Sequence, residues 1–510
     1  MQPEGETMQP KARTEIGTVA PLVPTNAMVR RLFSEMERRG LRYCHWKSSI
    51  RLEDALSGDD DIDLLVDRRD APSFYAAIVA IGFKLAVSRT GIGHPGVFHA
   101  FALDEETARL VHLHAYFQIV SGDSLVKTYR FPIESDLLEH TRFLYGVRVP
   151  AAEAELVLFV IRIALKHAGI VETLLVSRDY HTVSRELAWL QAQCDMAITQ
   201  SLCAAWFPGV NKDVFAGLMG AIADERAVLR RVWLGRKVAR ALKDLRRLSA
   251  PAAAANRAKR LCGLAFARFR RRKDLALHSG GAIVALVGPK AVGKSTLGSA
   301  LSIGLGEHLD VCRIHAGKPP ASGATFAIRL LVPVARRLFP QERPGEYEKS
   351  ARRQAKHYSM LYVLRMAVLA YDRRRLLRKA LRSATAGTIV ICDRYPSTTV
   401  GAIDSMQFDA DAHNNCNSAT KRRLMDLERK LGEDVPPANL IIRLVAPLAT
   451  SIRRDAGRNK QGGPDADAVE RRRSLEMHAE FGSTPVVHID TEQPLDESIR
   501  AVMRAVWCAL

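Results

Sequence analysis

The sequence predicts an α/β protein whose C-terminal half is a parallel sheet with helices on both faces. From Gly281 onward, short β-branched runs alternate with longer stretches in which apolar residues recur at helical spacing. Such alternation is typical of parallel strands joined by crossover helices. The first run, IVALVG at 283–288, leads into a glycine-rich turn and then a helical pattern. We expect a smaller α/β unit and a helical region to precede this half.

The length and composition limit the classes of protein to consider. A chain of 510 residues is several times the size of a typical domain, so two or three domains are expected. No run of eighteen uncharged apolar residues occurs, and the N-terminus lacks the apolar core of a signal peptide. We therefore expect a cytoplasmic protein. The eight cysteines are scattered without a CxxC pair, which argues against zinc ligands and disulfides.

The local patterns divide the chain into five expected segments. The first residues are polar and rich in proline, which is typical of disorder. A mixture of helical and strand patterns follows, and then apolar residues recur almost only at helical spacing. We expect a disordered tail (1–25), an α/β domain (26–150), a helical region (151–225), a basic linker or helical pair (226–279) and a C-terminal α/β domain (280–510).

The positive charge is concentrated in the fourth segment. The chain has a net charge of +20, and from Arg226 to Lys273 seventeen Lys or Arg stand against one acid, Asp244. Two interpretations remain open. The segment is either a solvated basic helix or a contact with an anionic surface, such as a membrane or a nucleic acid.

Residues 288–295 read GPKAVGKS and match the GxxxxGK[ST] spacing of a P-loop. In such a loop the glycines let backbone N–H groups face a phosphate, the lysine reaches the β- and γ-phosphates, and the hydroxyl ligates Mg²⁺. We therefore predict ATP and Mg²⁺ as cofactors, with Lys294 catalytic and Ser295 a metal ligand. The predicted nucleotide contacts are Gly288, Pro289, Lys290, Ala291, Val292, Gly293, Lys294, Ser295 and Thr296.

A second group of candidate residues follows the strand pattern TIVIC. These residues are Asp393, Arg394 and Tyr395. Ligands bind at the carboxyl ends of the strands in open parallel sheets. Asp393 is therefore predicted to contact the magnesium ion or its water, and Arg394 to face phosphate. The alternative is a buried ion pair at the strand end.

The order of these elements resembles that of the thymidylate kinases over roughly 280–510. The similar elements are the loop, the pair Asp372–Arg373 in a helical pattern, the DRY element 393–395, the strand LIIRLVAP, an arginine-rich segment SIRRDAGRNK and a last strand PVVHID. The resemblance implies transfer of the γ-phosphoryl group of ATP to a nucleoside monophosphate or a related phosphorylated small molecule, and also a homodimer.

The resemblance also implies roles for individual residues. Arg373, Arg394 and Tyr395 would bind the acceptor, and Arg453, Arg454 and Arg458 would belong to a mobile lid. The implied catalytic set is Lys294, Asp393, Arg394, Arg454 and Arg458.

One residue of the loop departs from the family pattern. Lys290 stands where thymidylate kinases usually carry an acid that approaches the sugar of the acceptor. By charge alone, Lys290 favours a more negatively charged acceptor, or a different one altogether.

The N-terminal α/β domain carries two alternating carboxylates, Asp61 and Asp63, at the start of a strand pattern. Both project from one face of a strand, which is an arrangement that can hold a divalent metal. The pattern resembles the nucleotidyltransferases, in which a glycine-containing turn precedes such a strand. Lys47 and Ser48 stand at the place of that turn.

The third carboxylate of the nucleotidyltransferases has no acidic counterpart here, because His112 or His114 occupies its place. The resemblance implies a nucleotidyltransferase-like fold. Two alternatives to phosphoryl transfer therefore remain open: nucleotidyl transfer through Asp61 and Asp63, and an ATP-binding regulatory protein with little turnover.

Overall fold

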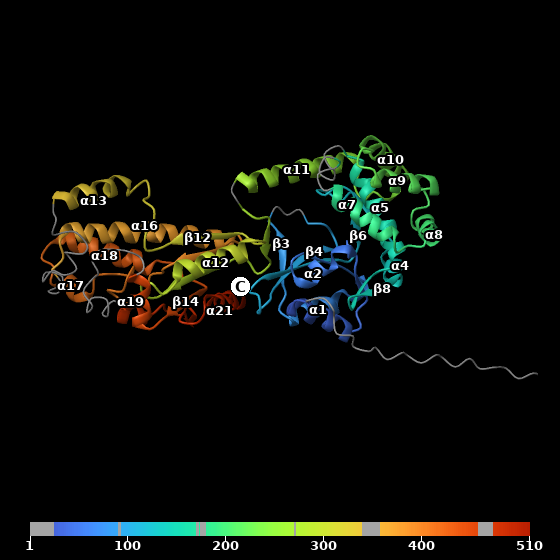
Figure 1. Cartoon of the computed structure of the whole chain (residues 1–510). Coiled ribbons are helices and arrows are strands. Elements are labelled where there is room, and N and C mark those ends of the chain that lie inside the picture. Colours follow the sequence, from blue (N-terminus) through green and yellow to red (C-terminus); the bar gives the residue numbers. More distant parts are fainter. Residues whose placement is uncertain are drawn as a thin grey trace, which may run out of the picture.

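The protein is described by a computed structural model that covers residues 25–89, 93–169, 173, 180–269, 272–338, 357–456 and 473–510. These residues form two α/β lobes, on the right and the left of Figure 1. The N-terminal lobe contains a six-stranded mixed sheet and the C-terminal lobe a five-stranded sheet. All eight cysteines are free. None of the helices in the described part of the chain combines the length and apolar character needed to cross a bilayer.

The N-terminal sheet has the strand order β1-β2-β5-β4-β3-β10. The chain from Leu110 to Ser121 forms two strands, of which only the first joins this sheet. The strands of this lobe are β1 (Tyr43–His45), β2 (Ile62–Val66), β3 (Lys84–Ser88), β4 (Val97–Leu103), β5 (Leu110–Tyr116), β6 (Ile119–Ser121), β7 (Tyr129–Phe131), β8 (Thr141–Leu144) and β9 (Val147–Pro150), and its helices are α1 (Ala27–Arg38), α2 (Leu52–Ser57), α3 (Ala71–Ala80) and α4 (Glu134–Glu139).

The helical region is built around α5 (Ala152–His167), which is buried on nearly all sides. Around it lie α7 (Tyr180–Gln191), α8 (Met196–Trp206), α9 (Lys212–Ala223) and α10 (Val228–Ala241). The basic segment 226–279 contains α10, α11 (Ala250–Phe269) and β10 (Leu275–Leu277). Of these, α10 buries Leu234 and Val238 in the core of the helical region, whereas α11 buries only Ala253.

The C-terminal sheet is parallel throughout, with the strand order β12-β13-β11-β14-β15. Alternate residues of its central strand face opposite layers, because side chains alternate along a strand. Val284 and Leu286 pack against α12 and α21, whereas Ile283 and Ala285 pack against α16. The elements of this lobe are β11 (Ile283–Val287), α12 (Lys294–Gly306), β12 (Val311–His315), α13 (Phe326–Leu338), α16 (Met360–Thr385), β13 (Ile389–Asp393), α17 (Ala410–Asn414), α18 (Ala419–Glu433), β14 (Leu440–Val445), α19 (Leu448–Ala456), β15 (Val486–Asp490) and α21 (Leu495–Ala509). The parallel sheet with helices on both faces is therefore present.

The two lobes share one apolar core. Phe101 and Leu110 of the N-terminal lobe belong to the same buried cluster as Leu305 and Trp507 of the C-terminal lobe. Strand β10 extends the N-terminal sheet through antiparallel pairing with β3. An ion pair of 3.0 Å between Arg89 Nη1 and Asp310 Oδ2 also joins the lobes. Because apolar burial is the main stabilising force in folding, this shared core fixes one lobe on the other.

The shared core predicts a contrast between two apolar residues of α12. Leu305 is 1% or less exposed and Ile303 is 75% exposed. Leu305→Ala should lower the free energy of unfolding by about 2–5 kcal/mol, because it leaves a cavity in the core. Ile303→Ala should change it by less than about 0.5 kcal/mol. Urea unfolding of both variants checks this, and equal shifts would contradict a core that passes through α12.

Candidate active site

The phosphate-binding loop, residues 288–295, joins the end of β11 to the start of α12. Gly288 has a φ of 132° and Gly293 a φ of 94°, values that L side chains rarely adopt. A Cβ on Gly288 would lie 2.4 Å from the carbonyl oxygen of Leu444 in β14. Only glycine fits this approach, so the strand, loop and helix expected from the sequence meet with the tight turn that a phosphate cradle requires.

Lys294 is folded into this loop. Its side chain is buried, and Nζ donates hydrogen bonds to the carbonyl oxygens of Gly288 at 2.8 Å and Pro289 at 2.7 Å. The first turn of α12 has no side-chain cap, so its N–H groups and the positive end of the helix dipole remain available to an anion. Lys290, the residue that departs from the thymidylate kinase pattern, is exposed. The loop therefore has the donors and the charge that bind phosphate.

Asp393 lies beside this loop, at the carboxyl end of the adjacent strand. In the parallel register it is paired with Leu286 of β11 and with His315 of β12. Its Oδ1 atom is buried and has no hydrogen-bond partner among the described residues. Ser295 is exposed at the start of α12. An unsatisfied carboxylate oxygen and a hydroxyl, both at the carboxyl end of the sheet, suit Mg²⁺, which prefers oxygen ligands and retains several waters.

His315 was not predicted as a site residue. Burial lowers its pKa, while the neighbouring Asp393 raises it. Its Nδ1 accepts a hydrogen bond of 3.2 Å from the backbone N–H of Gly317. His315 therefore adds a titratable group to the edge of the sheet that carries the loop and Asp393.

Two arginines converge on one carboxylate at this edge. Arg373, from α16, places Nη2 3.3 Å from Oδ1 of Asp404, and Arg394 places Nη1 3.5 Å from Oδ2. The Nε atom of Arg373 also donates to the carbonyl oxygen of Ala316 at 3.0 Å. Burial lowers the pKa of Arg373, whereas Asp404 raises it. Arg373 and Arg394 were predicted from the sequence, whereas Asp404 was not.

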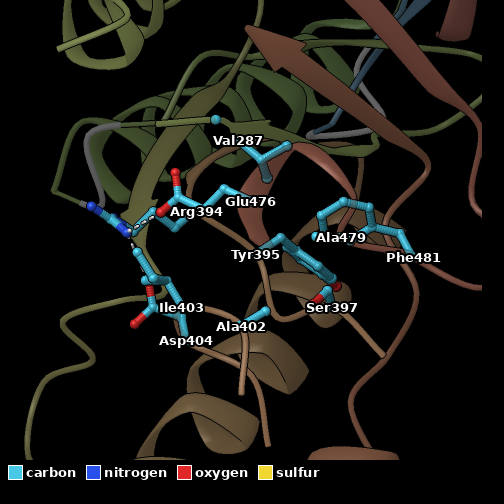
Figure 2. A pocket seen from close by; sticks show the side chains of 11 residues that line it. Val287, Arg394, Tyr395, Ser397, Ala402, Ile403, Asp404, Glu476, Ala479 and Phe481 are labelled. Atoms are coloured by element: carbon cyan, nitrogen blue, oxygen red, sulfur yellow. Dashed lines mark hydrogen bonds and ion pairs between the residues drawn. The ribbon is translucent and has the colours of Figure 1, made fainter. Parts of the chain in front are cut away.

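The cavity beside Arg394 and Asp404 is narrow. Figure 2 shows Arg394 lying between Asp404 and Glu476, whose Oε1 is 3.7 Å from Nη1 of Arg394. The hydroxyl of Tyr395 donates a hydrogen bond to the carbonyl oxygen of Pro436. Tyr395 lines the cavity, but its hydroxyl is already engaged by this bond. With a volume of about 30 Å³, the cavity has room for water but not for a nucleotide.

Among the described residues, Arg453, Arg454 and Asp372 do not line that cavity. Arg454 donates to the carbonyl oxygen of Thr491 at 2.7 Å, at the carboxyl end of β15. Arg453 is exposed, and Arg458 lies outside the described residues. Asp372 is buried and accepts hydrogen bonds from Thr325 and Arg329, so it holds the start of α13.

The N-terminal lobe brings its candidate residues together on β2 and β5, which pair in parallel. Asp63 Oδ1 lies 2.8 Å from Nζ of Lys47 and 3.1 Å from Nδ1 of His114. Asp61 Oδ1 lies 2.6 Å from Nδ1 of His112. The ring of His112 is 5.5 Å from that of His308, which follows α12 in the other lobe. Both carboxylates therefore have partners within the protein.

The basic side chains that contact Asp61 and Asp63 determine the charge around these two carboxylates. Burial alone would raise the pKa of Asp63, but Lys47 and His114 lower it well below its usual value. Burial lowers the pKa of Lys47 to about 7. In the part of the chain that the structure describes, no three His, Cys, Asp or Glu side chains are grouped to hold a metal ion. As arranged, Asp61 and Asp63 are both in contact with basic side chains, and their role as metal ligands stays a prediction.

Comparisons with known proteins find similar sequences and structures but assign no family to this chain. No protein-family model matches the sequence. It is 26% identical over 231 residues to the uncharacterized ATP-binding protein YghR of Escherichia coli strain K12, a match that covers 44% of this chain and 86% of that protein. The protein of the same name from Escherichia coli O6:H1 gives the same values.

Solved structures with similarity to 44% of this chain include three kinases. They are a thymidylate kinase from Candida albicans (14% identity, 90% of that chain, TM-score 0.27), a sugar kinase from a Janibacter species (12%, 94%, 0.22) and a deoxyadenosine kinase from M. mycoides with bound dCTP (14%, 97%, 0.24). At such low identities and TM-scores these structures assign neither a reaction nor an acceptor to this chain.

The close approach of Gly288 to β14 predicts a difference between two glycines of positive φ. Gly288→Ala should lower the melting temperature more than Gly280→Ala. Gly280 also has a positive φ, of 95°, but nothing lies within 4 Å of the Cβ position. Both variants strain the backbone, whereas only the first forces a methyl group against the Leu444 carbonyl. Thermal unfolding measures this, and equal losses would show that the loop yields to the extra atom.

Because Glu428, on α18, is buried near Arg373, we expect the free energy of unfolding to depend on pH. Burial raises its pKa from 4.5 to about 7, although the backbone N–H of Gln407 donates to it. The folded state therefore binds more protons than the unfolded state between these pH values, and the free energy of unfolding should fall as pH rises through this window. In Glu428→Gln this decline should be smaller. Urea midpoints across that range test it, with Glu433→Gln, an exposed residue of the same helix, as the control that should retain the decline.

Proposed function

We propose that the C-terminal lobe transfers the γ-phosphoryl group of ATP to a phosphorylated small molecule, in the manner of a nucleoside-monophosphate kinase. One observation carries the proposal. A phosphate-binding loop with a buried lysine, an unsatisfied carboxylate oxygen on Asp393 and the pair Arg373 and Arg394 all lie at the carboxyl edge of one parallel sheet. In-line transfer of a phosphoryl group needs these parts, because positioning and charge neutralisation supply most of its catalysis.

The residues of the donor side follow from the loop. Backbone N–H groups of the loop and the first turn of α12 bind the β-phosphate, and Lys294 exchanges its bonds to the loop carbonyls for bonds to the β- and γ-phosphates. Ser295 and Asp393 would hold Mg²⁺, which when bound neutralises charge on the phosphates. Arg453, Arg454 and Arg458 would approach the transferring group, a role that rests on the resemblance to the thymidylate kinases.

The residues of the acceptor side are the two converging arginines. Asp404 supplies the anion between Arg373 and Arg394 in this structure. An acceptor phosphate carries more charge and more acceptor oxygens than a carboxylate, so it would replace Asp404 between the guanidinium groups. Lys290, exposed at the rim of the loop, favours an acceptor with additional negative charge over deoxythymidine monophosphate.

Two observations bear on the alternatives. The name of the Escherichia coli relative describes ATP binding, which supports a nucleotide site here and is equally consistent with a regulatory protein of low turnover. Nucleotidyl transfer at Asp61 and Asp63 stays a hypothesis, and Lys47, His112 and His114 in contact with these carboxylates disfavour it.

The proposal predicts a product and a dependence on Lys294. Incubation of the full chain with Mg·ATP and a panel of nucleoside monophosphates and phosphosugars should release ADP with at least one acceptor. Lys294→Ala should lower kcat/KM on the order of 10²–10³-fold, the usual cost of removing one donor to the transition state. Arg394→Ala should act mainly through the KM of the acceptor. Coupled detection of ADP and of pyrophosphate measures both products.

The controls separate the three hypotheses. Lys430→Ala removes an exposed lysine of α18 and should leave the rate unchanged. Pyrophosphate release that is lost in Asp61→Asn would favour nucleotidyl transfer and defeat the kinase proposal. ATP binding without either product, over the whole panel, would instead favour the regulatory protein.

A further inference from the structure

The most basic stretch of the chain includes α10 and α11, which carry a cationic surface away from the candidate active site. In the view of Figure 1 these helices run along the upper margin of the N-terminal lobe. They belong to the stretch from Arg226 to Lys273, which contains seventeen basic residues and one acid. Arg270 and Arg271 of this stretch lie outside the described residues. No residue of the phosphate-binding loop belongs to this surface, so it needs a separate explanation.

Basic side chains from both helices line one hollow. The cavity, of about 570 Å³, is bordered by Arg236 and Arg240 of α10 and by Arg257 of α11. Its acid is Asp123, which forms an ion pair of 3.1 Å with Arg257. Within the described part of the chain, the side chains of Arg236 and Arg240 form no hydrogen bond or ion pair with another residue. The lining also contains Lys166 and Arg246. The hollow therefore has an excess of cationic groups that suits a phosphate.

Large apolar side chains project from the same two helices. On α10, Leu229 is 85% exposed and Trp233 61% exposed, and both precede Arg236 on the solvent side of the helix. On α11, Leu261, Leu264 and Phe269 are 51%, 45% and 86% exposed. Isolated exposed apolar residues are normal, whereas a group of them among basic residues marks an interaction site.

The combination of these two features identifies the partner. We propose that α10 and α11 dock the protein on a bilayer that contains acidic phospholipids. The headgroup phosphates enter the hollow, and the exposed leucines and aromatic residues enter the boundary between headgroups and acyl chains. Basic residues beside exposed Leu, Phe and Trp are typical of helices that lie in a membrane interface. A nucleic-acid site would need the charge and stacking rings, but not exposed Leu229, Leu261 and Leu264.

The test uses the full chain and two kinds of vesicle. In co-sedimentation, the protein should bind vesicles of one part phosphatidylglycerol to two parts phosphatidylcholine, and bind them more weakly as salt is added. Binding to phosphatidylcholine alone should be weaker by roughly tenfold or more, because the electrostatic attraction is missing. The double variant Trp233→Ser, Phe269→Ser keeps every charge and should weaken binding to the acidic vesicles by about tenfold.

A matched control comes from another part of the same lobe. Phe143, on β8, is 59% exposed, and β8 lies well below α10 and α11 in Figure 1. Phe143→Ser should bind acidic vesicles like the unchanged protein. Thermal unfolding of each variant shows that the fold is retained.

Three results would overturn the proposal. Equal binding to both kinds of vesicle would exclude recognition of the acidic headgroup. Unchanged binding of the double variant would show that the apolar residues do not enter the bilayer. Binding of a double-stranded DNA fragment in preference to acidic vesicles, with no effect of the double variant, would assign the surface to nucleic acid.

Discussion

The rest of the candidate site depends on one backbone contact, the approach of Gly288 to the carbonyl of Leu444. Because no Cβ stands between β11 and β14, the chain can turn sharply at the end of β11 and start α12 within a few residues. That turn directs backbone N–H groups and the start of α12 toward one point, and it places Lys294 inside the loop. The parallel register then brings Asp393 to the same edge. The proposed binding of phosphate and Mg²⁺ would thus follow from how the central strands pair.

Helix α12 connects this loop to the N-terminal lobe. Its first residue is Lys294, and beyond its last turn His308 lies against Phe101 and His112. Thirteen residues of helix span about 20 Å, so the two candidate sites lie at opposite ends of one rigid element. Leu305 near its end belongs to the core that both lobes share. Helix α12 is therefore a physical connection between the lobes.

Features that depend on residues close together in the sequence could be predicted, whereas contacts between residues far apart in the sequence could not. The loop and Asp393 were predictable because each is specified by neighbours in sequence: a β-branched run, glycines at fixed spacing, and a strand that ends in a carboxylate. Asp404 and Glu476 were missed because they meet Arg394 only through the tertiary fold, from segments without a motif of their own. The contact of Lys47 with Asp63 was missed for a similar reason. The sequence showed two alternating acids, whereas the charge balance around Asp63 depends on a lysine sixteen residues away.

The distribution of charge finally separates the two anionic partners inferred for this protein. Of the net charge of +20, sixteen units arise between Arg226 and Lys273, so the rest of the chain is close to balanced. In the candidate active site the arginines are matched by acids, as Arg373 and Arg394 are by Asp404. A small anion that binds to these arginines must compete with the carboxylate of Asp404. This competition favours a phosphate, which offers more charge and more acceptor oxygens than a carboxylate. The surface of α10 and α11 has few acids to displace, so it attracts an extended anionic surface through charge density, while its exposed apolar residues determine which kind of surface is bound.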